Sequence, residues 1–285
     1  MKATLDCIPC FIRQTLEAAR MVSTDPAVHE QIVREVLRWT GEMDLRIPPP
    51  VMGQRIHRRL REITGVEDPY RAAKEQSNRM ALSLLPELKA MIDTAPDPLI
   101  TAARLAIAGN VIDMGVNGTV TETDVRRSIQ HALEEPFTGD SAGFQQAIAN
   151  ARNILYLADN AGEIVFDRLL IEQLPPGRVT VAVRGAPILN DATLTDARAV
   201  GLHEIAEIID NGSDAPGTVL ADCSPEFNRR FAAAGLILAK GQGNFETLND
   251  ESRDIFFLFK AKCPVIAAHA GVPVGAQVCM DGGGA

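Results

Sequence analysis

The sequence has few aromatic residues, few cysteines and fewer basic than acidic side chains. Only 5% of its 285 residues are aromatic, and five are cysteines. An odd number of cysteines in a chain of this length gives no obvious disulfide framework, which fits a reducing compartment. The net charge of −9 argues against broad nucleic-acid binding, because neutralising phosphates requires clustered lysine and arginine. An anionic small molecule remains possible, since the local field of a site can oppose the overall charge.

Long hydrophobic segments are also missing. The N-terminus has no apolar stretch behind a basic start, so no signal peptide is predicted. The most apolar longer segment, residues 99–116, contains Arg104, Asn110 and Asp113, which would be costly in lipid. We therefore expect a cytoplasmic protein that neither spans nor binds a membrane. The sequence does not determine its oligomeric state.

The hydrophobic periodicity is helical up to about residue 135 and changes from about residue 150. Before this change, apolar residues recur at helical spacing, as in Ile8, Phe11, Ile12 and Leu16. Further helices are expected over 51–64, 69–93, 97–115 and 122–134. After it, short apolar runs predict strands over 153–158, 179–183, 207–209, 236–239 and 265–268, separated by helical segments such as 162–173 and 225–234. We predict a helical region over 1–140 and an α/β domain over 141–285 with a three-layer, mostly parallel, Rossmann-like sheet.

Polar side chains follow four of the expected strands. The first strand ends at Asp159 and Asn160, and the second runs into the loop 184–191, which begins with Arg184 and ends with Asp191. Because the carboxyl ends of parallel strands open onto one crevice, we expect these loops to converge there. Two carboxylates and an amide oxygen are hard ligands that suit Mg²⁺ or Mn²⁺.

The fourth expected strand is followed by Lys240 and a glycine-containing loop. Lys240 would supply positive charge, and the backbone amides from Gly241 to Asn244 would supply donors, a combination suited to a phosphate. The glycines match neither a P-loop nor a dinucleotide-binding fingerprint, which argues against an ATPase or a nicotinamide-dependent enzyme.

Each of these residues also has an ordinary structural explanation. An Asp159–Asn160 pair before a glycine is commonly a turn or a helix cap, and Asp191 could cap a helix that begins near Thr193. Lys240 could be a solvated strand end. Glu163 could accept a hydrogen bond from a metal ligand or simply provide negative charge in the first turn of a helix.

Two further features allow several interpretations. Asn110 and Asp113 share one helix face and could bond to backbone or line the site. The pair Cys7 and Cys10 could be ordinary core cysteines, a redox pair, or half of a structural metal site completed by Cys263 and Cys279.

Six short motifs in this order resemble the damage-control phosphatase family, long labelled a domain of unknown function and linked to a disputed protein-carboxyl methyltransferase activity. The resemblance covers nearly the whole chain and is greatest to the prokaryotic branch, which carries the N-terminal cysteine pair. The motifs are residues 7–10 (CIPC), 68–70 (DPY), 109–113 (GNVID), 159–163 (DNAGE), 187–191 (PILND) and 240–246 (KGQGNFE).

The resemblance implies a helical N-terminal region packed on a three-layer α/β domain, and a divalent-metal-dependent phosphatase that acts on small phosphorylated metabolites. It implies that Asp159, Asn160 and Asp191 hold the metal, which could be Mg²⁺, Mn²⁺, Co²⁺ or Ni²⁺. It also assigns Lys240 to the site and implies that Asn110 and Asp113 line it. No role for Cys7 and Cys10 follows from it.

Phosphoryl transfer requires mainly positioning and neutralisation of the phosphate oxygens. In the expected site the metal, Lys240 and the amides of Gly241 to Asn244 would do this, with Arg184 as a second cation and Asp113 as a base or leaving-group acid. Attack by water is favoured over a phosphoaspartate, because both carboxylates would already bind the metal.

Two rival functions belong to other classes. A methyltransferase that uses S-adenosylmethionine would need a glycine-rich loop after the first strand, and the segment 159–162 supplies one glycine. A non-catalytic metal or redox module built on Cys7 and Cys10 would show tightly bound zinc or iron and no hydrolysis. The substrate itself cannot be named from the sequence.

Overall fold

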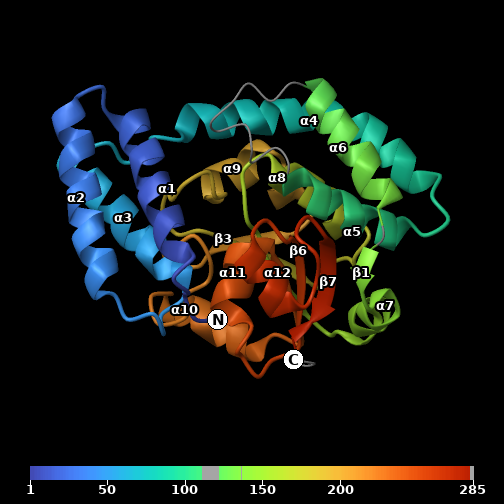
Figure 1. Cartoon of the computed structure of the whole chain (residues 1–285). Coiled ribbons are helices and arrows are strands. Elements are labelled where there is room, and N and C mark those ends of the chain that lie inside the picture. Colours follow the sequence, from blue (N-terminus) through green and yellow to red (C-terminus); the bar gives the residue numbers. More distant parts are fainter. Residues whose placement is uncertain (111–121, 136, 283–285) are drawn as a thin grey trace.

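Five helices form the N-terminal region in the computed structural model, which describes residues 1–110, 122–135 and 137–282. They are α1 (Cys7–Val22), α2 (Pro26–Glu42), α3 (Pro49–Thr64), α4 (Arg71–Asp93) and α5 (Pro98–Ala108). Their boundaries follow local chemistry: the Asp25 carboxylate caps α2 and the Asp97 carboxylate caps α5, each followed by a proline. In Figure 1, α1, α2 and α3 stand together at one side of the molecule, while α4 extends away from them.

The remaining elements form a seven-stranded sheet with interleaved helices. In chain order they are α6 (Glu122–Glu134), β1 (Phe137–Gly139), α7 (Ser141–Asn150), β2 (Ile154–Leu157), α8 (Glu163–Ile171), β3 (Val179–Val183), α9 (Leu194–Ala199), β4 (Glu207–Asp210), α10 (Pro225–Ala233), β5 (Leu236–Lys240), α11 (Gly241–Leu248), β6 (Ile255–Lys260), α12 (Pro264–Ala270) and β7 (Gln277–Asp281). The strand order is β1-β7-β6-β5-β2-β3-β4, and each pairing is parallel except β6 with β7. The expected mostly parallel α/β fold is therefore confirmed.

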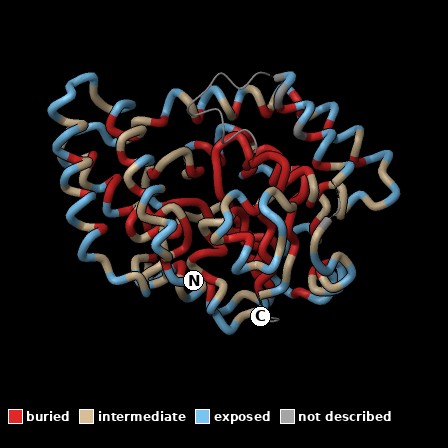
Figure 2. Tube along the Cα trace, in the orientation of Figure 1, coloured by how far each residue is buried: buried red, intermediate tan, exposed pale blue. Residues whose placement is uncertain are grey.

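The sheet divides the core into two layers. Leu236 and Leu238 of β5 pack with residues of α4, α5 and α8 on one face, and Ile237 and Ala239 pack with α10, α11 and α12 on the other. A third cluster, centred on Ile32, joins α1, α2 and α3. Figure 2 shows the buried residues concentrated at the sheet, with exposed residues mainly on the outer helices. Within the three described ranges, no helix is long and apolar enough to cross a membrane.

The strand expected over 265–268 is wrong. These residues belong to α12, which begins at Pro264 and ends before Gly271, a glycine in the left-handed conformation. Proline at the first helical position and glycine just past the end are standard helix boundaries, and they outweigh the apolar run. The strand lies earlier, at Ile255–Lys260, where five of six residues are apolar; β1 and β7 were also missed.

Candidate active site

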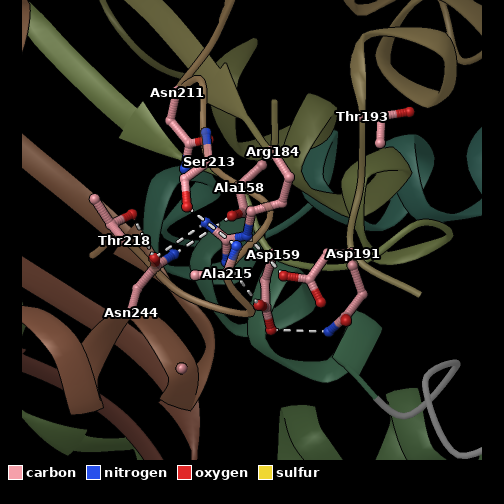
Figure 3. A network of polar contacts seen from close by, with 12 residues as sticks. Ala158, Asp159, Arg184, Asp191, Thr193, Asn211, Ser213, Ala215, Thr218 and Asn244 are labelled. Carbon is pink, nitrogen blue, oxygen red and sulfur yellow. Dashed lines mark hydrogen bonds and ion pairs between the residues drawn. The ribbon is translucent and has the colours of Figure 1, made fainter. Parts of the chain in front are cut away.

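The loops after β2 and β3 are joined by backbone hydrogen bonds. Asn160 and Asp191 form an isolated antiparallel bridge, in which the Ala161 amide donates to the Asn190 carbonyl at 2.9 Å. On the other side, the Ala192 amide donates to the Asp159 carbonyl at 2.8 Å. The backbone thus brings Asp159, Asn160 and Asp191 together, and Figure 3 shows the Asp159 and Asp191 side chains next to each other.

A glycine makes room for the Asp159 carboxylate. Gly241 begins α11 with φ +76°, and a Cβ built on it would lie less than 3.0 Å from both carboxylate oxygens of Asp159. The loop after β5 therefore approaches the loop after β2 more closely than any other residue type allows. Part of the glycine-containing loop predicted to bind phosphate is thus used to accommodate Asp159.

The three residues lie on one wall of a cavity of about 630 Å³. The facing wall comes from the helical region and includes Phe11, Arg13 and Ile56, and Tyr70 also lines the space. Helix α3 is held there by ion pairs of its Arg58 and Arg61 with Asp214, in the loop after β4. The cavity thus lies between the helical region and the carboxyl ends of the strands, where ligands bind in open α/β sheets.

Arg184 lies beneath the two aspartates rather than in the cavity. Its side chain is 2% exposed, and its Nε donates to Asp191 Oδ2 at 2.7 Å. Its Nη2 is 3.5 Å from Asp159 Oδ1, and its Nη1 donates to Asn244 Oδ1 at 3.3 Å (Figure 3). Asn244 also accepts a hydrogen bond from Thr218 Oγ1 at 2.8 Å. Arg184 and Asn244 thus support the aspartates from below.

A second buried charge cluster surrounds Lys240. Its ammonium donates to Glu163 Oε1 at 2.7 Å, Asp167 Oδ1 at 2.5 Å and the Ala106 carbonyl at 2.9 Å. These contacts use all three of its hydrogens, and the side chain is fully buried. Burial alone would lower the pKa of Lys240, but the two carboxylates raise it above its ordinary value, so the lysine stays charged. No donor is left on Lys240 for a phosphate.

Four buried carboxylates, those of Asp159, Glu163, Asp167 and Asp191, share the buried cations Lys240 and Arg184. Burial, together with the neighbouring Glu163 and Asp191, raises the pKa of Asp159 well above its ordinary value. Four carboxyl groups thus share two buried cations, and a bound divalent cation would favour the ionised form of Asp159 that burial disfavours. The carboxyl groups of Asp159 and Asp191 and the side-chain amide of Asn160, which line the cavity, contain the oxygen donors that such a cation accepts.

The structure separates the predicted site residues into two groups. Asp159, Asn160 and Asp191 line the cavity. Buried beneath them are Asn110, Arg184, Lys240 and Asn244, of which Asn110 donates to Glu163 Oε2 at 2.7 Å. Asp113 lies outside the described residues.

Lys262 was missed by sequence reasoning. It follows β6, lines the cavity and is close enough to Asp159 to lower the pKa of that carboxyl, although burial has the larger, opposite effect. The signal that could have located it is the hydrophobic run 255–259, since recognising β6 would place Lys262 at the carboxyl end of a strand.

The cysteine pair also borders this cavity. Cys7, Cys10 and Cys263 line it, whereas Cys279 is buried in the sheet. All five cysteines are free thiols. Among the described residues, no group of three or more His, Cys, Asp or Glu side chains is placed to hold a metal ion, so the structural metal site considered as one interpretation of Cys7 and Cys10 is not assembled there.

Comparisons with known proteins agree on one family. The model of the damage-control phosphatase ARMT1-like domain matches residues 3–278. A damage-control phosphatase of Archaeoglobus fulgidus is 36% identical over 284 residues, and one of Pyrococcus horikoshii is 34% identical over 287; each alignment covers 98% of both chains. The crystal structure of a DUF89 family protein from Pyrococcus horikoshii superimposes with a TM-score of 0.90 at 33% identity, covering 99% of each chain.

Proposed function

The chain belongs to the damage-control phosphatase ARMT1-like family, and on this premise we propose that it is a divalent-metal-dependent phosphatase of small phosphorylated metabolites. The observation that carries the proposal is the convergence of Asp159, Asn160 and Asp191 on one cavity wall, in a cluster where four buried carboxyl groups share two buried cations. The cavity, at about 630 Å³, has room for a metabolite of the size of a sugar phosphate.

We propose that Asp159, Asn160 and Asp191 hold the metal. When bound, a divalent cation would neutralise charge on a phosphate oxygen and lower the pKa of a water molecule. Arg184 keeps the Asp191 carboxylate in place through its 2.7 Å hydrogen bond, while the backbone bridge between the two loops fixes the spacing of the ligands. This preorganisation keeps the ligand oxygens together before the cation arrives.

The substrate phosphate would be bound by groups that reach the cavity. Lys262 offers an ammonium on the same side as Asp159, and Gln242 and Gly243 bring the first turn of α11 to the cavity wall. A lysine and a helix N-terminus both stabilise negative charge on phosphate oxygens. We therefore assign to Lys262 the phosphate contact that the sequence suggested for Lys240. The role of Asp113 as base or leaving-group acid stays a prediction.

A phosphatase screen tests this proposal. The metal-stripped chain is assayed for phosphate release from sugar phosphates and cofactor fragments with Mg²⁺, Mn²⁺, Co²⁺ or Ni²⁺, beside Asp159→Ala and Asp191→Ala. We expect metal-dependent hydrolysis that both variants lose and a chelator abolishes. Unchanged metal-stimulated hydrolysis in Asp159→Ala would refute the site. Methyl transfer from S-adenosylmethionine without phosphate release would favour the rival enzyme.

A further inference from the structure

We propose that Glu163 is a positioning residue that orients the Asn160 side chain, so that the amide oxygen Oδ1 rather than the nitrogen Nδ2 faces the cavity. The inference rests on the proposed metal site. It assigns to the Glu163 carboxylate the role of determining which Asn160 atom is presented to a metal. Glu163 lies at the first position of α8, 1% exposed, three residues after Asn160.

Two neighbouring carboxyl groups determine the orientation of the Asn160 amide. Its Nδ2 donates to Asp159 Oδ2 at 2.8 Å and to Glu163 Oε2 at 2.9 Å. The Glu163 carboxylate is paired with the Lys240 ammonium and only accepts hydrogen bonds, so the amide nitrogen must face it. Rotating the amide by 180° would place Oδ1 against two carboxylate oxygens and turn an NH₂ group, which is not a metal ligand, toward the cavity.

Glu163 is itself held by charge from the opposite side. The Lys240 ammonium binds Glu163 Oε1 at 2.7 Å, leaving Oε2 for the amides of Asn160 and Asn110 at 2.9 and 2.7 Å. The two oxygens therefore have different partners, and the carboxylate has one orientation. The three donors come from β5, from the loop after β2 and from the residue two positions past α5. A carboxylate that merely placed charge in the first turn of a helix would not require such partners.

The variant Glu163→Gln tests this arrangement with almost no change in shape. Lys240 needs an acceptor at the Oε1 position, so the new amide nitrogen would take the place of Oε2. It would then face the NH₂ groups of Asn160 and Asn110, so that donors would face donors. Asn160 can remove its part of this conflict by rotating its amide, which turns its nitrogen toward the cavity. We expect the dissociation constant for Mn²⁺, measured by electron paramagnetic resonance titration of the metal-free chain, to rise about 10- to 100-fold.

Asp167→Asn is the matched control. Asp167 is fully buried and also bonds to Lys240, but its other partner is Tyr156 rather than Asn160. We expect Asp167→Asn to lower the melting temperature while changing the Mn²⁺ dissociation constant less than about threefold. A merely structural role would make both substitutions weaken Mn²⁺ binding alike. Unchanged Mn²⁺ binding by a folded Glu163→Gln variant would overturn the inference.

In a chain that already carries Asn160→Asp, the Glu163→Gln substitution should strengthen Mn²⁺ binding instead of weakening it. In Asn160→Asp, the new carboxylate has an oxygen in either orientation but faces Glu163 and is repelled by it. Adding Glu163→Gln supplies a donor there, so the double variant should bind Mn²⁺ more tightly than Asn160→Asp alone. Weaker binding by the double variant contradicts the proposal.

A measurement on the unsubstituted chain does not depend on any variant folding. Both Asn160 Nδ2 protons lie in hydrogen bonds to carboxylates, so nitrogen-15 NMR should find them slow to exchange with water before and after Mg²⁺ is added. Fast exchange would mean that Nδ2 faces the cavity and would overturn the inference. If the unsubstituted chain binds none of the four divalent metals, the proposed metal site fails as well. If the unsubstituted chain binds Mn²⁺ and the Glu163→Gln variant binds it with the same dissociation constant, the proposed metal site stands and only the positioning role of Glu163 fails.

Discussion

Replacing Gly241 by alanine should damage the proposed metal site through one methyl group. Gly241 has φ +76°, a conformation that costs a residue with a Cβ about 1–2 kcal/mol. The added carbon would also lie less than 3.0 Å from both oxygens of the Asp159 carboxylate, a spacing that Cβ atoms essentially never show. Because Asp159 contacts Asn160 and Arg184, a shift of its carboxylate would disturb those two contacts.

Gly177→Ala separates the two effects. Gly177 has nearly the same φ, +74°, but its Cβ would meet nothing within 4 Å. Gly177→Ala should lose about 1–2 kcal/mol of unfolding free energy, about 2–8 °C in melting temperature for a chain of this size, and Gly241→Ala should lose more because of the added overlap with Asp159. Only Gly241→Ala should lose Mn²⁺ affinity, by at least about tenfold, in a titration followed by electron paramagnetic resonance. Equal Mn²⁺ affinity in the two variants would refute the proposed closeness of Gly241 to the metal ligands.

The remaining predictions concern the two lysines and a buried histidine. Lys262→Met should raise KM for a phosphorylated substrate about 10- to 100-fold, because the substrate loses a charge-assisted hydrogen bond. The melting temperature should change little. Lys240→Met should instead lower the unfolding free energy by about 3–5 kcal/mol, because it leaves Glu163 and Asp167 without their buried cation. Burial, with some help from Arg61, lowers the pKa of His57 to about 4. The unfolded chain therefore binds more protons between pH 6.5 and 4, so unfolding free energy should fall by about 3 kcal/mol as pH falls through that window.

Each of these expectations has a result that contradicts it. A Lys262→Met enzyme with unchanged KM would remove Lys262 from the phosphate site, and a Lys240→Met protein as stable as its parent would mean that the buried cluster contributes nothing. His57→Gln isolates the histidine from other titrating groups. If chemical unfolding at pH 6.5 and pH 4 gives the same difference in free energy with and without His57, the histidine is not the group responsible.

The convergence of Asp159, Asn160 and Asp191 was predictable because these residues follow strands that the sequence marks clearly. The runs before Asp159 and Arg184 are apolar, short and bounded by polar residues, and β2 and β3 form as expected. The role of Lys240 was not predictable from its place at a strand end. Side chains alternate along β5, so Lys240 shares a face with Leu236 and Leu238, toward α5 and α8, and is turned away from the cavity.

The contribution of the helical region could not be derived from periodicity. Which residues of α1 and α3 face the cavity depends on how these helices dock, and docking relies on pairs such as Arg58 and Arg61 with Asp214, more than 150 positions apart. A spacing rule relates residues within one element. It carries no information on contacts across that distance, so Arg13 and Tyr70 at the cavity were not anticipated.

Crystals grown with Mn²⁺ and inorganic phosphate test the central claim most directly, because anomalous scattering locates the metal. The account predicts one manganese peak in contact with oxygens of Asp159, Asn160 and Asp191, and a phosphate between that peak and the Lys262 ammonium. Manganese bound elsewhere, or a phosphate that contacts neither the metal nor Lys262, would contradict it.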